Sequence, residues 1–170
     1  MRLALARCST LSAIFLLTLT ACGPATSGSS APTDALLAAF GADTTQGTGT
    51  AAELRQRKAQ WVKIAPAHYT YVHVAECFCI ESVRQPTEME VQNGVVIGAR
   101  VVQTGAAVAN PTEFQRSIEQ LFDMAIEAAE RGVVVEATYD EKVGAPVRIV
   151  IGTLANDAGV GHRVSKIQAR

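Results

Sequence analysis

The sequence predicts an α+β fold, in which an antiparallel β-sheet of five to six strands carries two amphipathic helices packed on one face. Two stretches open with helix-capping patterns and continue with apolar residues at helical spacing. An Asn-Gly pair separates two strand-like runs, and further strand-like runs follow each helical stretch. The predicted order is α-β-β-β-α-β-β-β, within a single domain at residues 50–170.

The first helix is expected at residues 51–64, with Leu54, Trp61 and Val62 toward the core. The preceding Thr50-Ala-Ala-Glu segment fits a capping box, in which a hydroxyl and a carboxylate satisfy free backbone amides. A proline two residues after the helix prevents it from continuing. Residues 68–80, HYTYVHVAECFCI, are rich in β-branched and aromatic side chains, which predicts the first strand.

A hairpin follows this strand. Residues 88–92 and 95–102 alternate polar and apolar side chains on the two sides of Asn93-Gly94. This dipeptide is the strongest short-range signal for a two-residue turn between antiparallel strands. The alternation predicts a sheet with one buried and one solvated face.

The second helix has the clearest pattern and is expected at residues 112–131. Thr112 to Gln115 resemble a capping box, and apolar residues then recur at helical spacing. Gly132 is well placed to end the helix. This segment should therefore pack one apolar face against the sheet.

Three strands complete the predicted sheet, at residues 133–139, 147–151 and 162–167. The last is polar enough to predict a position at the edge of the sheet. Each loop between these runs contains turn-forming residues.

Five residues are expected to shape turns rather than perform chemistry. Asn93 and Gly94 make the hairpin turn. Asp140 opens the next predicted turn, where Gly144 supplies unusual backbone angles and Pro146 supplies rigidity.

The N-terminus has the pattern of a bacterial lipoprotein signal. Arg2 and Arg7 precede an apolar run at residues 11–19, which is too short to be a stable membrane span. Leu19-Thr-Ala-Cys22 resembles the lipobox, the motif whose cysteine receives lipid and becomes the mature N-terminus. The resemblance implies that Cys22 carries a diacylglyceryl thioether and an N-acyl chain such as palmitate.

These features predict where the protein acts. Residues 1–21 would be the signal peptide, and residues 22–49, rich in Gly, Ser, Thr, Ala and Pro, a flexible tether. The protein would sit in the cell envelope, anchored to a membrane on its extracytoplasmic side. Loss of the signal leaves 13 of the 15 basic residues against 16 acidic ones, a formal charge of −3. This balance favours neither nucleic acid nor anionic lipid, so the expected partners are the membrane, through the lipid, and an envelope protein.

Two of the four cysteines are left as candidate thiols. Cys8 leaves with the signal and Cys22 is blocked by lipid, which leaves Cys77 and Cys79 in a compartment where disulfides persist. In a flat strand their Cα atoms would lie ~6.6–6.8 Å apart, at the upper limit for a disulfide, so pairing requires a bend at Phe78. A structural disulfide, reduced core thiols, a redox site and a metal site all remain open.

The metal alternative would need His73, which shares the cysteine face of the predicted strand. A straight strand would hold it ~20 Å from Cys79, too far for shared coordination. The sequence therefore predicts no metal ligands and no cofactor apart from the lipid on Cys22.

The chain carries none of the common catalytic motifs. It has no G-x-S-x-G, H-E-x-x-H, P-loop or dinucleotide-binding glycine pattern. Trp61, Tyr69 and Tyr71 fit core packing better than an exposed binding face. We therefore expect a non-catalytic binding or structural domain with an unknown ligand, with no catalytic residues. The alternative is an envelope thiol-redox protein that uses Cys77 and Cys79.

A series of landmarks resembles a family of secreted bacterial domains of unknown function, which commonly occur as lipoproteins. The resemblance covers about residues 53–167, implies an envelope location and brings no established reaction. One departure is Gly152, where family members often carry an acidic residue. The landmarks are Trp61, Tyr69-x-Tyr71, Cys77-Phe78-Cys79, Val91-x-Asn93-Gly94, Leu121-Phe122, Tyr139-Asp140 and Gly144-x-Pro146.

Overall fold

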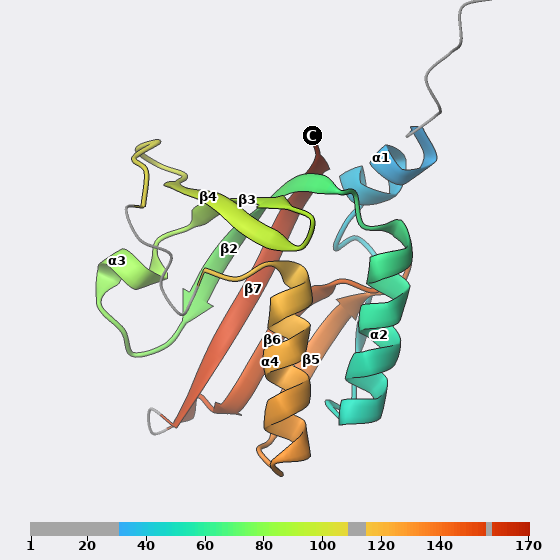
Figure 1. The fold of residues 1–170 in the computed structure, drawn as a ribbon. Coiled ribbons are helices and arrows are strands. Elements are labelled where there is room, and N and C mark those ends of the chain that lie inside the picture. The colour runs from blue at the N-terminus through green and yellow to red at the C-terminus, as the bar shows by residue number, and fades with distance from the viewer. Residues whose placement is uncertain (1–30, 109–114, 156–157) are drawn as a thin grey trace, which may run out of the picture.

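The computed structural model describes residues 31–108, 115–155 and 158–170 (Figure 1). The predicted signal peptide and Cys22 lie outside these residues. Within them, the chain forms one antiparallel sheet of seven strands together with four helices. The fold is therefore predominantly β.

The strands pair in the order β1-β5-β6-β7-β2-β3-β4, and every neighbouring pair is antiparallel. This order places β7 and β2, which are far apart in the sequence, side by side near the middle of the sheet. The strands are β1 (Thr44–Gln46), β2 (His68–Glu76), β3 (Thr87–Gln92), β4 (Val95–Val101), β5 (Val135–Asp140), β6 (Pro146–Thr153) and β7 (Ala158–Ala169).

Two long helices lie together across one side of the sheet, and two short helices lie near the two ends of β2 (Figure 1). The short helix α1 contacts β7, whereas the short helix α3 contacts β2. The helices are α1 (Ala31–Ala38), α2 (Ala51–Ile64), α3 (Glu81–Arg84) and α4 (Ile118–Glu130).

The hydrophobic core lies between this side of the sheet and the long helices. Leu54 and Trp61 of α2 are fully buried, as are several apolar residues of α4. Val62 was expected to join them, but it is 53% exposed, because it directly follows Trp61 and therefore points about 100° away from it around α2. The largest buried side chains from the sheet are Tyr69, Tyr71, Met89, Tyr139 and Ile149.

The predicted fold class was wrong. The sequence suggested an α+β fold with five to six strands and two helices, whereas the described residues form seven strands and four helices. The missed elements are short: β1 has three residues, α3 has four and α1 has eight. Segments of this length are too short to show a clear hydrophobic period.

Part of the predicted tether belongs to the folded domain. Leu37 of α1 is only 3% exposed and joins the hydrophobic core. In β1, Thr44 pairs with Asp140 and Gln46 with Thr138. The ordered domain therefore begins before Thr50. The burial of Leu37 and the pairing of β1 hold this segment against the domain, although its composition is that of a linker.

The predicted edge position of the last strand was also wrong. β7 lies between β6 and β2, and its edges are hydrogen-bonded on both sides. Its polar appearance has two sources. Arg163 projects from one face into an ion pair, whereas His162 is buried on the other face beside Val164 and Ile167.

The second long helix starts later than predicted. α4 is capped by Ser117, whose hydroxyl accepts a hydrogen bond from the amide of Gln120 while the Gln120 side chain caps the Ser117 amide. This is the capping box that the sequence placed at Thr112 to Gln115. Residues 112–114 lie outside the described part, and Gln115 is not helical.

The turn residues occupy two tight turns. Asn93 and Gly94 both have positive φ, at 50° and 76°, as a two-residue hairpin turn requires. Gly144 has φ 74° and approaches the Gln60 side chain of α2 so closely that a Cβ atom would clash. The buried Asp140 carboxylate accepts hydrogen bonds from the backbone amides of this turn.

Candidate functional site

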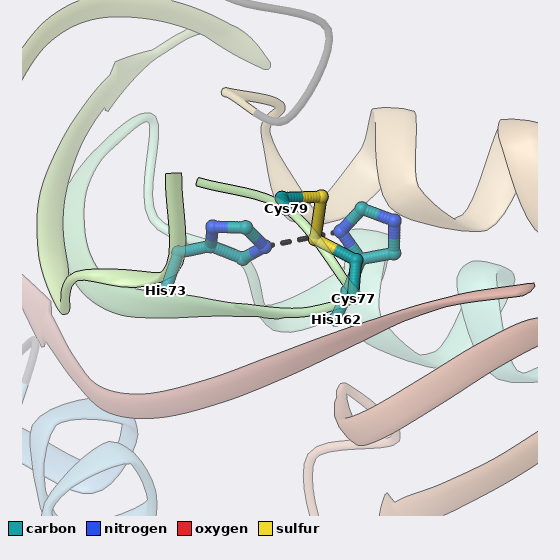
Figure 2. Close-up of a disulfide and its surroundings, with 4 residues drawn as sticks. All are labelled: His73, Cys77, Cys79 and His162. Carbon is teal, nitrogen blue, oxygen red and sulfur yellow. Dashed lines mark hydrogen bonds between the residues drawn. A yellow bond between two sulfur atoms is a disulfide. The ribbon is translucent and has the colours of Figure 1, made fainter. Parts of the chain in front are cut away.

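A disulfide joins Cys77 and Cys79 directly after β2 ends at Glu76 (Figure 2). Their Cα atoms are 5.2 Å apart, closer than residues i and i+2 of an extended strand. The strand prediction for residues 77–80 was therefore wrong, because the chain bends where the cysteines pair. Both cysteines are half-buried.

The residue between the cysteines points into solvent. Phe78 is 79% exposed, and Ile80, after the second cysteine, is 72% exposed. We call residues 77–80 the apolar tip. An open pocket of ≈640 Å³ lies beside it, between the tip, α3 and the start of the β6–β7 connection. The pocket is lined by Val74, Ala75, Glu76, Cys77, Phe78, Cys79, Arg84 and Leu154.

Two buried histidines lie in the surroundings of the disulfide (Figure 2). His73 Nε2 and His162 Nδ1 are 3.1 Å apart, and the two rings are stacked with centroids 5.3 Å apart. The register explains their meeting, because His162 pairs across the sheet with Ala75, two residues from His73. The small Ala75 side chain leaves room for both rings.

Both imidazoles are held neutral. Burial, and then the neighbouring His162, lower the pKa of His73 to about 3. Burial, and then the positive charge of Arg116, lower the pKa of His162 to about 4. A neutral imidazole has one nitrogen that accepts and one that donates a hydrogen bond, so the two rings can share one hydrogen bond. With pKa values this far below 7, almost no imidazolium is present at neutral pH, and the pair is a poor proton donor there.

A second charged cluster lies next to the tip. The Glu76 carboxylate accepts hydrogen bonds from Arg148 Nε at 2.7 Å and from Arg163 Nε at 3.0 Å. Burial alone would raise the pKa of Glu76, but these two guanidinium groups lower it. They fix the last residue of β2 to β6 and β7, and so hold the base of the tip.

The aromatic residues of the first strand belong to the core. Trp61 Nε1 and the Tyr69 hydroxyl each donate a 2.8 Å hydrogen bond to the Glu119 carboxylate, and Tyr71 donates to the backbone oxygen of Arg116. Burial raises the pKa of both tyrosines. These contacts connect α2, β2 and α4, and all three aromatic side chains are fully buried.

The sequence located the cysteines and placed His73 on their face of the predicted strand, but it did not predict that His73 pairs with His162. Alternation in residues 158–169 places His162 on the same face as Val164, which signals burial, but it does not reveal which strand lies opposite. The pairing with His73 needs the β2–β7 register. The turns at Asn93-Gly94 and at residues 140–146 belong to other loops, away from the tip (Figure 1).

Two further observations concern metal binding and membrane spanning, and both apply to the described residues. In residues 31–108, 115–155 and 158–170, no cluster of three or more His, Cys, Asp or Glu side chains is arranged to hold a metal ion. Over the same part of the chain, no helix is both long and apolar enough to cross a membrane.

The fold and the site define a predominantly β domain, built on one antiparallel sheet and closed at one end by a disulfide. The chain belongs to a family of unknown function, DUF6174, whose match covers residues 53–169. A comparison with curated proteins found no match.

Proposed function

We propose that the chain is a lipoprotein of the cell envelope, held on the extracytoplasmic side of a membrane by lipid on Cys22. The support is the N-terminal pattern of basic residues, an apolar run and the lipobox-like residues 19–22. Several acyl chains together give stable anchoring, since each buried methylene contributes ~0.8 kcal/mol.

Within this lipoprotein, the domain acts as a non-catalytic binding module, and the apolar tip is its contact surface. The observation that carries this proposal is the exposure of Phe78 and Ile80, at 79% and 72%, on a loop closed by a disulfide. Adjacent exposed apolar side chains mark interaction sites. A covalently closed loop also loses less conformational entropy on binding than an open one.

The position of the tip favours an envelope protein as the partner. α1, the first described element after Cys22, lies by the start of β2, and the tip follows the end of β2. The nine residues of β2 separate the two by ~30 Å. The tip would therefore face away from the membrane that holds the anchor.

The anchoring is tested by replacing Cys22 with Ser and following the protein between detergent and aqueous phases. We expect the variant to leave the detergent phase, because its acyl chains are lost. Cys8→Ser is the matched control and should stay in the detergent phase. Retention of Cys22→Ser in the detergent phase would remove the lipoprotein proposal.

The contact surface is tested by placing a photo-crosslinking phenylalanine at position 78 in cells. Val134, which is 62% exposed on another part of the molecule, is the matched control position. We expect a protein adduct from position 78 alone, and at least tenfold weaker binding of the purified partner by Phe78→Ser. Equal adducts from both positions, or unchanged binding by Phe78→Ser, would contradict a specific tip.

A second candidate is thiol-disulfide exchange in the envelope, which a half-buried disulfide that lines an open pocket favours. A thiolate of a partner dithiol would attack one sulfur and form a mixed disulfide, and the other cysteine would leave as a thiolate and take up a proton. The second partner thiol would then release both cysteines reduced, with two electrons transferred. Reduction of the folded protein by dithiothreitol at pH 7 should release two thiols, counted by alkylation and mass spectrometry, and a disulfide that stays intact under excess dithiothreitol would exclude this role.

A further inference from the structure

A cavity of ≈740 Å³ lies at the opposite end of β2, where α1 meets the sheet. We call it the anchor-end cavity. Its volume falls within the range of small-ligand sites, about 300–1,000 Å³. Its lining residues are Asp34, Leu37, Ala38, Pro66, Ala67, His68, Lys166, Ile167, Gln168, Ala169 and Arg170.

One lining residue has a strained backbone. Lys166 has φ 52°, in the left-handed region that side chains other than Gly, Asn and Asp rarely adopt. It lies where β7 carries an extra residue against the Thr70–Val72 segment of β2. Bulges of this kind redirect side chains and are frequent next to functional sites. Here Lys166, the residue at the bulge, lines the cavity.

Two opposite charges in this lining are unpaired among the described residues. Neither Asp34 nor Lys166 forms an ion pair or side-chain hydrogen bond there, either with each other or with a third group. By contrast, Arg170 lies 3.9 Å from Glu88, and His68 is 2.9 Å from Glu90. The cavity thus offers one free carboxylate and one free ammonium group at separate places.

The cavity also lies near the proposed anchor. Asp34 is in α1, which begins nine residues after Cys22. Nine residues span at most ~30 Å when fully extended. The lipid on Cys22 would therefore keep this end of the domain close to the surface of the bilayer.

We propose that the anchor-end cavity binds the zwitterionic phosphoethanolamine headgroup of a membrane phospholipid. The phosphate lies against Lys166, with Arg170 next to it, and the primary ammonium group donates to the Asp34 carboxylate. A ligand that carries both charges matches both free groups, whereas a simple anion would leave Asp34 unmatched. This inference rests on the proposed lipid anchor, which supplies the nearby bilayer.

The test uses the full lipidated chain in nanodiscs of phosphatidylcholine alone or with one-third phosphatidylethanolamine or phosphatidylglycerol. Hydrogen exchange of residues 164–170 is the readout. We expect exchange at least threefold slower with phosphatidylethanolamine than in the other two discs. Choline cannot donate a hydrogen bond to Asp34, and phosphatidylglycerol carries no cation. Equal protection in all three discs, or equal protection by phosphatidylglycerol and phosphatidylethanolamine, would overturn the proposal.

Variants test whether the headgroup binds in the cavity or elsewhere on the surface. Lys166→Gln and Asp34→Asn should each remove the difference in hydrogen exchange between the discs with and without phosphatidylethanolamine. Arg131→Gln, an exposed charge change beyond the end of α4, should keep it. If Arg131→Gln removes the difference as well, or Lys166→Gln keeps it, the cavity is not the binding site.

A soluble arm tests the cavity independently of the anchor. Glycerophosphoethanolamine added to the protein should slow exchange of residues 164–170 at least threefold, whereas inorganic phosphate at the same concentration should not. If the chain fails to stay in discs but responds to glycerophosphoethanolamine, the anchor fails and the cavity stands. If the chain stays in discs but neither phosphatidylethanolamine nor glycerophosphoethanolamine slows hydrogen exchange of residues 164–170, only the cavity proposal fails.

Discussion

The two ends of β2 are built in opposite ways. At the tip end, a disulfide closes the chain, two guanidinium groups neutralise Glu76, and two imidazoles are buried without charge. At the α1 end, a helix is attached through one deeply buried side chain, Leu37, and charged groups line an open cavity. The first end is fixed, with the Glu76 charge paired, and exposes apolar surface. The second exposes unpaired charge.

This difference indicates two kinds of recognition. A fixed apolar loop suits a protein surface, because binding it requires little reordering. Separate unpaired charges suit a small polar group that can approach both at once. The length of β2 keeps the two sites apart, so each can be changed without direct effect on the other.

The largest expected effect is acid destabilisation through the histidine pair. The folded protein holds His73 and His162 at pKa values of about 3 and 4, below the value near 6.5 expected when unfolded. Their contribution to stability is thus fully present above pH 6.5 and is lost progressively as the pH falls through the folded-state pKa values of about 4 and 3. Between pH 7 and 5 we expect the free energy of unfolding to fall by roughly 2–4 kcal/mol. Urea denaturation at the two pH values measures this.

The variant that tests this prediction is His162→Gln, which removes one of the two buried imidazoles. It should reduce the loss of unfolding free energy between pH 7 and 5 by about half. A loss that persists in His162→Gln would mean that other groups cause the acid sensitivity, and that the tip end is not stabilised by neutral histidines.

The next effect concerns the attachment of α1. Leu37→Ala removes a side chain that is 3% exposed, which should cost about 2–3 kcal/mol. If α1 detaches first, proteolysis should cut residues 31–40 before the sheet unfolds. Leu36→Ala, a change of the same size at a partly buried neighbour, should cost less. Equal costs would show that α1 does not depend on this single contact.

Opening the disulfide should have a smaller effect on global stability. The bond joins residues only two apart, and closing so short a loop contributes about 1–2 kcal/mol by chain entropy. Cys77→Ser with Cys79→Ser should therefore lower the unfolding free energy by no more than this, while hydrogen exchange in residues 77–80 rises strongly. A loss well above 2 kcal/mol would assign the bond to the stability of the whole sheet rather than to the tip.

The comparison between the two ends also explains what the sequence could and could not predict. The hairpin at Asn93-Gly94 needs only local turn chemistry, and the burial of Trp61 needs only helical spacing. The cysteine pair was one of several alternatives until the bend after Glu76 was known. The histidine pair and the anchor-end cavity depend on how β7 lies against β2 and on its bulge at Lys166. Register between distant strands is not encoded in either strand alone.

The smallest expected effect gives the sharpest test of the α1 end. Lys166→Gly relieves the strain of a positive φ, so it should raise the unfolding free energy by about 0.5–1 kcal/mol while removing the ammonium group from the cavity. Lys166→Ala removes the same charge but keeps the strain, so it should give no gain. Both should lose the response to phosphatidylethanolamine. Suppose that Lys166→Gly is more stable than the original protein but no longer binds the headgroup. The strained backbone at Lys166 would then serve to position this side chain for binding. A destabilised Lys166→Gly would mean instead that the lysine packs usefully where it lies and that the left-handed conformation carries no functional information.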